Sequence, residues 1–297
     1  MKALTVIVAM LSGFFAQAKM MQQPASTPLA LAEKKAEKAA LNAKPVRKEN
    51  ITRGPYHLFG ESHSQVSLKS TQLQGKVFYI VSGHGGNDTG AIGKKGHNTL
   101  CEDEYTYDIA LRLARQLVAH GATPYVIVRD PDDGIRDENF IGSTQDKHEV
   151  YWKNTPIPTN HRDRLHTRIK IIDTLYQEHG EATDQRIIFL HIDSRPDASE
   201  QIDVYFLNKR NDGTGRQLSS SIRNVFATKY STRNRPYHGK VKSNNWLFVH
   251  RYTNHIPSTF IELGNIHNPL DQLRFTLSSN REALANWITE GVLSSFE

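Results

Sequence analysis

The sequence predicts an α/β domain built on a largely parallel central sheet. Short apolar runs rich in β-branched and aromatic residues alternate along the chain with segments of helical periodicity. Strands that alternate with helices in this way are typical of crossover units, in which neighbouring strands are parallel. The chain has 297 residues and a single cysteine, so an intramolecular disulfide is excluded. A folded unit of roughly 200 residues can bury a sizeable core without such a bond.

The first predicted strand covers residues 76–82, and a glycine-rich loop follows at 83–96. Apolar residues at every fourth position from Tyr105 to Leu117 predict an amphipathic helix that ends at Gly121. The further predicted strands are 124–128, 186–191, 202–207, 246–249 and 259–263, and the further predicted helices are 164–176, 214–227, one that starts at Asn268-Pro269 and one that starts near Ser279.

Two of these helices have recognisable start signals. Proline is favoured at the first helical position, which is where Pro269 would lie. Ser279 and Glu282 have the spacing of a capping box. Between the second strand and the next helix, residues 130–161 are polar and contain glycine and proline, which predicts a long loop that either shapes a binding groove or merely decorates the surface.

The N-terminus has the order of a secretory signal peptide. Lys2 supplies a positive charge, residues 3–15 are mostly apolar, and Ala16-Gln17-Ala18 is a small-x-small cleavage site. The apolar run is shorter than the roughly 20 residues that span a bilayer. We therefore expect residues 1–18 to be removed on export, and we expect no transmembrane segment in the mature chain.

Residues 19–73 are predicted to form a basic, disordered tail and linker, because they are rich in Ala, Lys, Glu and Pro and offer little apolar surface to bury. The folded domain is predicted at 74–297. The net charge of +6 and the pI of about 9.2 favour an anionic partner. No nucleic-acid motif is present, so a polymer of the cell envelope is the expected partner.

Four polar residues lie at or near the ends of predicted strands and helices. His84 follows the first strand, Glu102 opens the first long helix, His191 ends the 186–191 strand, and Glu262 lies near the end of the 259–263 strand. Ligands of open α/β sheets bind at the carboxyl edge of the strands. Two imidazoles and one carboxylate suit a catalytic zinc ion with an open position for water, and a second carboxylate can act as a general base.

Local sequence around these residues resembles one family. Residues 82–93 read Ser-Gly-His-Gly-Gly-Asn-Asp-Thr-Gly-Ala-Ile-Gly, which resembles the Gly-His-Gly-Gly-x-Asp-x-Gly-Ala-x-Gly signature of the zinc-dependent N-acetylmuramoyl-L-alanine amidases, the amidase 3 family. Residues 100–113 resemble the family's second zinc-ligand segment and its helix, and 189–191 resemble the strand of the third ligand. Residues 257–265 resemble the segment with the catalytic glutamate, and 268–271 continue the match.

The resemblance implies a phosphorylase-like α/β sandwich with a twisted, mostly parallel sheet. It implies one zinc ion per catalytic domain, held by His84, Glu102 and His191, with Glu262 as the general base. The implied reaction is hydrolysis of the amide bond between N-acetylmuramic acid and L-alanine of peptidoglycan. The signal peptide implies action in the periplasm or outside the cell. A monomer, open to control by a protein activator, is the further expectation.

Some assignments stay open. Glu104 is a rival to Glu102, because the stretch before the helix is slightly longer than the family usually has. After His191 the family usually has Ala-Asn, whereas this chain has Ile-Asp-Ser at 192–194. Arg251 resembles an arginine that would hold a carboxylate of the stem peptide, with a structural salt bridge as the alternative reading. Asn265 lies in the segment of the catalytic glutamate and is a second substrate-binding candidate.

Two other functions fit the same residues. A zinc peptidase that cuts within the stem peptide would share the metal chemistry and differ only in the shape of its cleft. A protein that binds the cell wall without turnover would need a lost ligand or base, and all four positions are filled here.

Overall fold

A computed structural model describes residues 52–142 and 148–297, so the predicted signal peptide and most of the predicted tail lie outside the described residues. The core is a six-stranded sheet in which all neighbouring strands are parallel except one antiparallel pair. Its strands, in spatial order, are β12 (Val241–Ser243), β11 (Tyr205–Asn208), β13 (Ser258–Asn265), β10 (Gln185–Asp193), β3 (Val77–Ser82) and β6 (Thr123–Val126). The antiparallel pair is β11 and β13.

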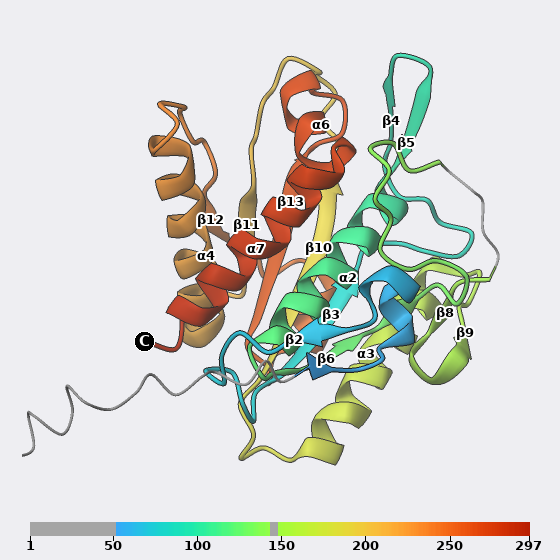
Figure 1. Cartoon of the computed structure of the whole chain (residues 1–297), viewed down its shortest axis with the longest axis vertical. Coiled ribbons are helices and arrows are strands. Elements are labelled where there is room, and N and C mark those ends of the chain that lie inside the picture. Colours follow the sequence, from blue (N-terminus) through green and yellow to red (C-terminus); the bar gives the residue numbers. More distant parts are fainter. Residues whose placement is uncertain (1–51, 143–147) are drawn as a thin grey trace, which may run out of the picture. The chain divides into compact units, whose positions relative to one another are not determined.

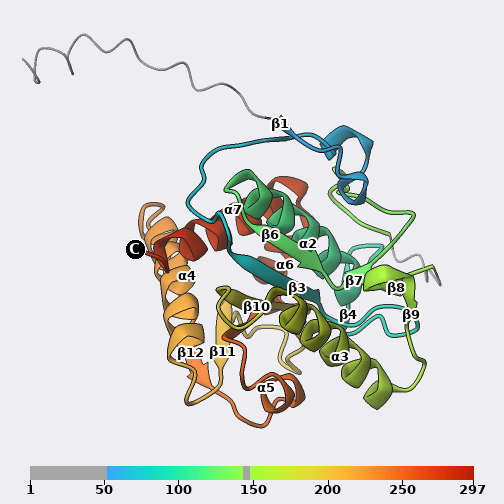
Figure 2. The same ribbon diagram turned by 90° about the horizontal axis from the view of Figure 1, so that it is seen from below.

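Helices cover both faces of this sheet (Figures 1 and 2). One face carries α2 (Glu102–Ala119), α4 (Gly213–Ser231), α6 (Pro269–Thr276) and α7 (Ser278–Ser294). The other carries α3 (His161–His179) and α5 (Phe248–Tyr252). The predicted fold class, a mostly parallel sheet flanked by helices, is confirmed. No helix in the described part of the chain combines the length and apolarity needed to cross a membrane.

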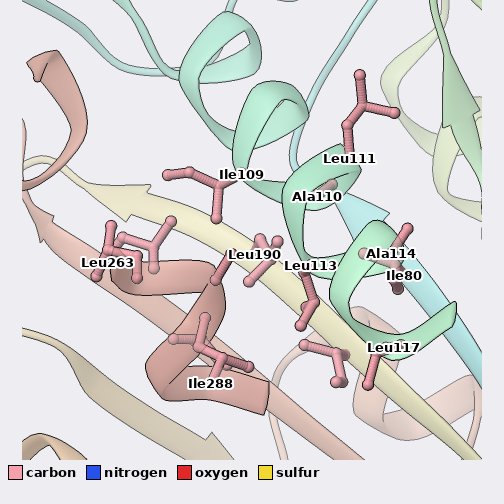
Figure 3. Packing of buried hydrophobic residues seen from close by; sticks show 14 of the residues in the cluster. Ile80, Ile109, Ala110, Leu111, Leu113, Ala114, Leu117, Leu190, Leu263 and Ile288 are labelled. Atoms are coloured by element: carbon pink, nitrogen blue, oxygen red, sulfur yellow. The ribbon is translucent and has the colours of Figure 1, made fainter. Parts of the chain in front are cut away.

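Alternate residues of the central strands enter two separate cores. Leu190 and Leu263 pack towards α2 and α7, whereas Phe189 and Phe260 pack towards α3 and α5. Figure 3 shows the first core, where side chains of α2 and of Ile288 meet those of the sheet. Because both faces are covered, the strands read as continuous apolar runs in the sequence. Full burial of each such side chain contributes about 1.5–3 kcal/mol.

Buried ion pairs fix α2 against α7. Asp108 of α2 accepts hydrogen bonds from Arg112 at 2.8 Å and from Arg281 of α7 at 2.6 Å. Asp108 and Arg281 are both fully buried. Losing one partner of such a group leaves an uncompensated buried charge, so these contacts set how the two helices pack.

Short strands and turns surround the central sheet. Two segments that were predicted as loops contain short strands. The glycine-rich loop contains the first strand of a hairpin. Residues 130–161 contain two strands, of which the first pairs with the strand at 128–129 and the second pairs with the first. These elements are β4 (Ile92–Lys95), β5 (Asn98–Cys101), β7 (Val128–Arg129), β8 (Val150–Tyr151), η3 (Trp152–Asn154) and β9 (Thr155–Pro156).

The predicted linker boundary at residue 73 lies too far along the chain. Residues 52–73 form β1 (Thr52–Arg53), η1 (His57–Phe59), η2 (Glu61–His63) and β2 (Val66–Ser67). The side chains of Phe59, Val66 and Leu73 are each at most 2% exposed and belong to the core around α2. These few apolar residues, spaced widely among polar ones, give no periodic signal, yet they cover the outer side of α2.

Two local predictions are wrong. Residues 246–249 are not a strand, because the side chain of Asn244 accepts hydrogen bonds from the amides of Trp246 and Leu247 and begins the turn that leads into α5. The capping box at Ser279 is also absent: α7 begins at Ser278 without a side-chain cap, and Glu282 bonds to Arg112 and Gln116 of α2 instead. The start of α6 is as predicted, with Asn268 capping it and proline at its first turn.

The packing of 52–73 predicts a large effect of Phe59→Ala. Removing this buried ring should lower the free energy of unfolding by about 3–5 kcal/mol, because the cavity cannot be refilled by the short segment around it. Urea unfolding of the mature protein measures this change. Phe140→Ala is the matched control, since that ring is 38% exposed. Equal, small effects of both substitutions would show that residues 52–73 behave as a linker.

Candidate functional site

Three predicted side chains meet at the carboxyl edge of the sheet. His84 follows β3, His191 lies near the end of β10, and Glu102 is the first residue of α2. Oε2 of Glu102 is 3.1 Å from Nε2 of His84, and Oε1 is 2.9 Å from Nδ1 of His191. The three residues each offer a ligand atom within 4.8 Å of the others. The structure therefore brings together the three side chains that the sequence predicted as metal ligands.

The hairpin β4–β5 delivers Glu102 to this edge. The amide of Glu102 donates to the carbonyl of Ala91 at 3.0 Å, and the amide of Ala91 donates back to Oε2 of Glu102 at 2.9 Å. The rival Glu104 points elsewhere, because its carboxylate pairs with Arg136 at 2.6 Å. The geometry thus favours Glu102 over Glu104 as a ligand.

Glycines allow the backbone to approach the cluster closely. A Cβ atom on Gly90 would lie 2.5 Å from Cδ2 of His84 and 2.6 Å from Oε2 of Glu102. A Cβ atom on Gly83 would lie 2.6 Å from Nδ1 of His191. Neither position has room for a side chain, which explains the glycine-rich character of the segment.

His84 is held in an unusual conformation by residues of α3. Its φ angle is +64°, in the left-handed region that L-residues rarely adopt. Arg168 donates a hydrogen bond to the carbonyl of His84. Nδ1 of His84 is 3.1 Å from Asp88, which in turn pairs with Arg164 at 2.7 Å. A carboxylate on one ring nitrogen fixes the tautomer and points the other nitrogen at the ligand position.

The charges around the cluster perturb its ionisable groups. Burial lowers the pKa of His84, but hydrogen bonds to Asp88 and Glu102 outweigh it and raise the pKa to about 10. Burial raises the pKa of Glu102, yet contacts with His191 and His84 dominate and hold that pKa well below its usual range. Burial lowers the pKa of His191. The shifts of Glu102 and His191 favour the deprotonated forms that bind metals, whereas a metal at His84 would have to displace a proton that Asp88 and Glu102 hold there.

Glu262 lies beside the cluster. It is directly opposite His191 in the parallel pairing of β10 with β13, so both side chains leave the same face of the sheet. Its Oε2 atom is buried and has no hydrogen-bond partner among the described residues. Burial raises the pKa of Glu262, and the nearby carboxylates of Asp193 and Glu102 raise it further. An unpaired buried oxygen with a raised pKa is suited to accept a proton.

The residues present fit a zinc ion. Two imidazoles and one carboxylate form the donor set of many catalytic zinc sites, which leave the fourth position open. The orphaned oxygen of Glu262 lies next to these donors, and the two close glycines leave no room for other side chains. The cluster is therefore a candidate zinc site.

Asp193 belongs to a group of side chains that the sequence did not predict. Tyr205 donates a hydrogen bond to its carboxylate at 2.7 Å, and Arg195 pairs with it at 2.7 Å. Tyr205 is directly opposite Glu262 in the antiparallel pairing of β11 with β13. Asp193, one of the unusual residues after His191, therefore forms part of the wall next to Glu262.

The two candidate substrate-binding residues lie apart from the cluster. Asn265 is fully buried, and its side chain donates to the carbonyls of Asp197 and Glu200 and accepts from the amide of Arg195. These bonds use up its polar atoms, so a direct contact with substrate does not fit. Arg251 on α5 lines a separate cavity. Lys209 and the residues that lead into α4 form one part of its wall, and Pro257, just before β13, forms another.

Asp88, Arg164 and Arg168 are the supporting residues that sequence reasoning missed. Asp88 lies inside the recognised motif, which was the available signal. No sequence signal marked the two arginines, because polar residues on a helix predict a side that faces solvent. In the structure, Arg164 bonds to Asp88, 76 residues earlier, and Arg168 bonds to His84, 84 residues earlier.

A mostly parallel sheet covered on both faces, with this cluster at its carboxyl edge, is an arrangement typical of α/β enzymes, and its donor set is one that metal-assisted hydrolases use. Residues 79–294 match the family model described as N-acetylmuramoyl-L-alanine amidase. The chain belongs to this family and to its enzyme class, the amidases that act on bacterial cell wall.

Individual relatives agree with this assignment. The germination-specific N-acetylmuramoyl-L-alanine amidase of Bacillus subtilis is 25% identical over 230 residues, which are 76% of this chain and 82% of that protein. The CwlD amidase from Clostridioides difficile, solved in complex with the GerS lipoprotein, has a TM-score of 0.54 at 18% identity and covers 74% of this chain and 98% of that one. The amidase AmiC2 of Nostoc punctiforme has a TM-score of 0.52 at 17% identity, with coverage of 75% and 97%.

The contacts of Gly90 predict that Gly90→Ala weakens zinc binding by at least about tenfold, because the new methyl group displaces His84 and Glu102. Calorimetric titration with zinc measures the affinity. Gly96→Ala is the matched control: Gly96 has a similar φ of +59° against +67° for Gly90, but open space around its Cβ position. Equal loss in both variants would mean that backbone strain, not the cluster, is responsible.

The raised pKa of Glu149 predicts that the free energy of unfolding depends on pH. Burial raises its pKa from 4.5 to about 8, aided by Asp103 and Glu104 and opposed by a hydrogen bond from the amide of Gly86. The folded protein therefore binds this proton more tightly than the unfolded chain does. Its contribution to stability is complete below pH 4.5 and is lost as the pH rises to about 8.

Glu149→Gln keeps an acceptor for Gly86 and removes the titration. We expect its Tm to exceed that of the wild type by a margin that grows over this pH range and then levels off. Thermal unfolding across the range measures the margin, and Glu61→Gln, at an exposed position, is the control. A margin that does not change with pH would contradict the prediction.

Proposed function

We propose that the chain hydrolyses the amide bond between N-acetylmuramic acid and L-alanine of peptidoglycan, using one zinc ion held by His84, Glu102 and His191. The observation that carries this proposal is the convergence of these three side chains beside the unpaired oxygen of Glu262. Membership of the amidase family supports the choice of bond.

The chain's own residues would divide the chemistry as follows. When bound, zinc supplies a Lewis acid that polarises an amide carbonyl and lowers the pKa of water to about 7. Glu262 takes a proton from the attacking water and delivers it to the departing nitrogen of L-alanine. Burial raises the pKa of Glu262, which makes it a stronger base once it is ionised.

Other residues hold this arrangement in place. Asp88 and Arg168 fix the ring and the backbone of His84. His191 stacks on Phe260 with ring centroids 4.3 Å apart, which sets the plane of its imidazole. A site whose ligands are locked by neighbours reorganises little during reaction.

We further propose that residues 1–18 direct export and that the mature protein acts in the periplasm or outside the cell. The net charge of +6 suits an anionic wall polymer. Action as a monomer and control by a protein activator stay predictions; one structural relative was solved bound to a lipoprotein.

Glu262→Gln provides the test. This variant should keep zinc, since Glu262 is not among the three clustered ligands, and should lose about 10²- to 10⁴-fold in turnover, since glutamine cannot accept a proton. His84→Ala and His191→Ala should lose zinc together with activity. Metal analysis and digestion of purified sacculi measure both properties, with and without a chelator.

Mass spectrometry of the products separates the alternatives. Free stem peptides with intact glycan identify the amidase, whereas shortened stem peptides identify a peptidase. Unchanged sacculi with zinc-loaded wild-type protein would indicate binding without turnover. Wild-type turnover in Glu262→Gln would refute the role given to this residue.

A further inference from the structure

A row of paired positions crosses the sheet at the catalytic edge. His191 of β10 is opposite Glu262 of β13, and Glu262 is opposite Tyr205 of β11. Phe206 pairs with Val241 of β12, and its amide donates to the carbonyl of Lys240 at 2.8 Å, so Lys240 continues the row beside Tyr205. Side chains at paired positions leave the same face of a sheet. The row therefore runs from the candidate zinc site to Lys240.

A cavity of about 160 Å³ lies at the far end of this row. It is bordered by the segment after β10, by Tyr205 and by the start of β12, and it is open to solvent. The charged side chains in its lining are Arg195, Glu200, His238, Lys240 and Lys242.

Positive charge dominates this lining. Arg195 is neutralised by Asp193, and His238 lies 2.8 Å from Asp203. Lys240 and Lys242 are exposed and have no carboxylate within 4 Å in the described part of the chain. Two lysines therefore remain against a single carboxylate, Glu200. Such an excess of like charge around a small cavity favours an anionic ligand.

Nothing in the fold explains this excess. Lys242 contacts the ring of Tyr205 from 5.9 Å and makes no buried bond. Arg195 borders both the cavity and the pair formed by Asp193 and Tyr205, so the cavity is continuous with the wall beside Glu262.

We propose that this cavity binds a free carboxylate in the peptide part of the substrate, with Lys240 and Lys242 as the residues that select it. This inference rests on the proposed function, because it assigns the peptide side of the scissile bond to the β11–β12 side of Glu262. Neighbouring strands lie about 4.8 Å apart, so Lys240 is about 10 Å from Glu262 along the row. An extended peptide covers that distance in about three residues.

This assignment replaces the role that the sequence suggested for Arg251. Arg251 lines its cavity together with Lys209 and Pro257, which lie at the carboxyl end of β11 and before the start of β13. Because β11 is antiparallel to β13, these positions lie at the edge of the sheet opposite to the catalytic edge.

The test uses the zinc-loaded Glu262→Gln protein, which binds substrate without cutting it. Calorimetry compares a muramyl tripeptide with versions in which each free carboxylate in turn is replaced by a carboxamide. We expect one of these replacements to weaken binding about five- to tenfold, which is the effect of losing ion pairs with the two exposed lysines. Added salt should reduce the difference in affinity between the carboxylate and carboxamide peptides.

Adding Lys240→Ala and Lys242→Ala should weaken binding of the parent tripeptide to the level of that carboxamide, and should abolish discrimination between the two. Arg162→Ala with Lys170→Ala removes the same charge from exposed positions on α3 and should preserve discrimination. Both lysines of the cavity are exposed, so these variants should fold, and thermal unfolding checks this.

Equal binding of all the peptides, no binding of any, or discrimination that survives loss of both lysines would overturn the proposal. The outcome is separable from that of the proposed function. Discrimination by a protein whose wild type does not release stem peptides would refute the amidase reaction and keep the carboxylate site. Release of stem peptides by the wild type, without discrimination between the peptides, would support the amidase reaction and refute the carboxylate site.

Discussion

The carboxylate of Glu102 is the contact on which the site depends. One oxygen reaches His84 and the other reaches His191, so a single side chain joins the ends of β3 and β10 to the start of α2. Its position at the first turn of α2 favours negative charge, because the helix dipole is positive there. The group is 3% exposed, and its ion pairs must offset the loss of hydration. The hairpin that precedes α2 is fixed by the same carboxylate.

A second constraint comes from the opposite face of the sheet. The left-handed backbone of His84 costs about 1–2 kcal/mol, and α3 supplies the bonds that hold it. Arg168 binds the carbonyl of His84, and Arg164 acts on its ring through Asp88. The candidate ligands are thus set by helices on both faces, and the reversed strand β11 adds Tyr205, which bonds to Asp193 of β10 beside Glu262. The site is a property of the whole sheet rather than of one loop.

Much of this architecture could be predicted from local patterns. The strands at 76–82, 186–191 and 259–263 are apolar on both faces, so burial alone identified them, and the observed β3, β10 and β13 begin or end within two residues of those limits. The grouping of His84, Glu102 and His191 followed from the rule that parallel strands share a carboxyl edge, strengthened by the family resemblance.

The parts that could not be predicted depend on long-range pairing. The direction of β11 is invisible in its four residues, yet it decides that Tyr205 faces Glu262 and that Arg251 lies at the other edge. Glu282 has the spacing of a helix cap, but Arg112 of α2 offers its carboxylate a charged partner. Residues 52–73 fold because α2 provides an apolar surface for Phe59, and no pattern within the segment reveals that surface.

The buried ion pairs between α2 and α7 affect the order in which the protein can fold during synthesis. During synthesis, His84 and Glu102 leave the ribosome long before Arg281 does. Until α7 exists, Asp108 lacks one of its two cationic partners and the face of α2 that meets Ile288 stays in water. The helix that carries Glu102 then keeps its contacts with the sheet and with residues 52–73 but lacks those with α7. The packing of the helix that positions Glu102 is therefore completed only after translation has passed α7.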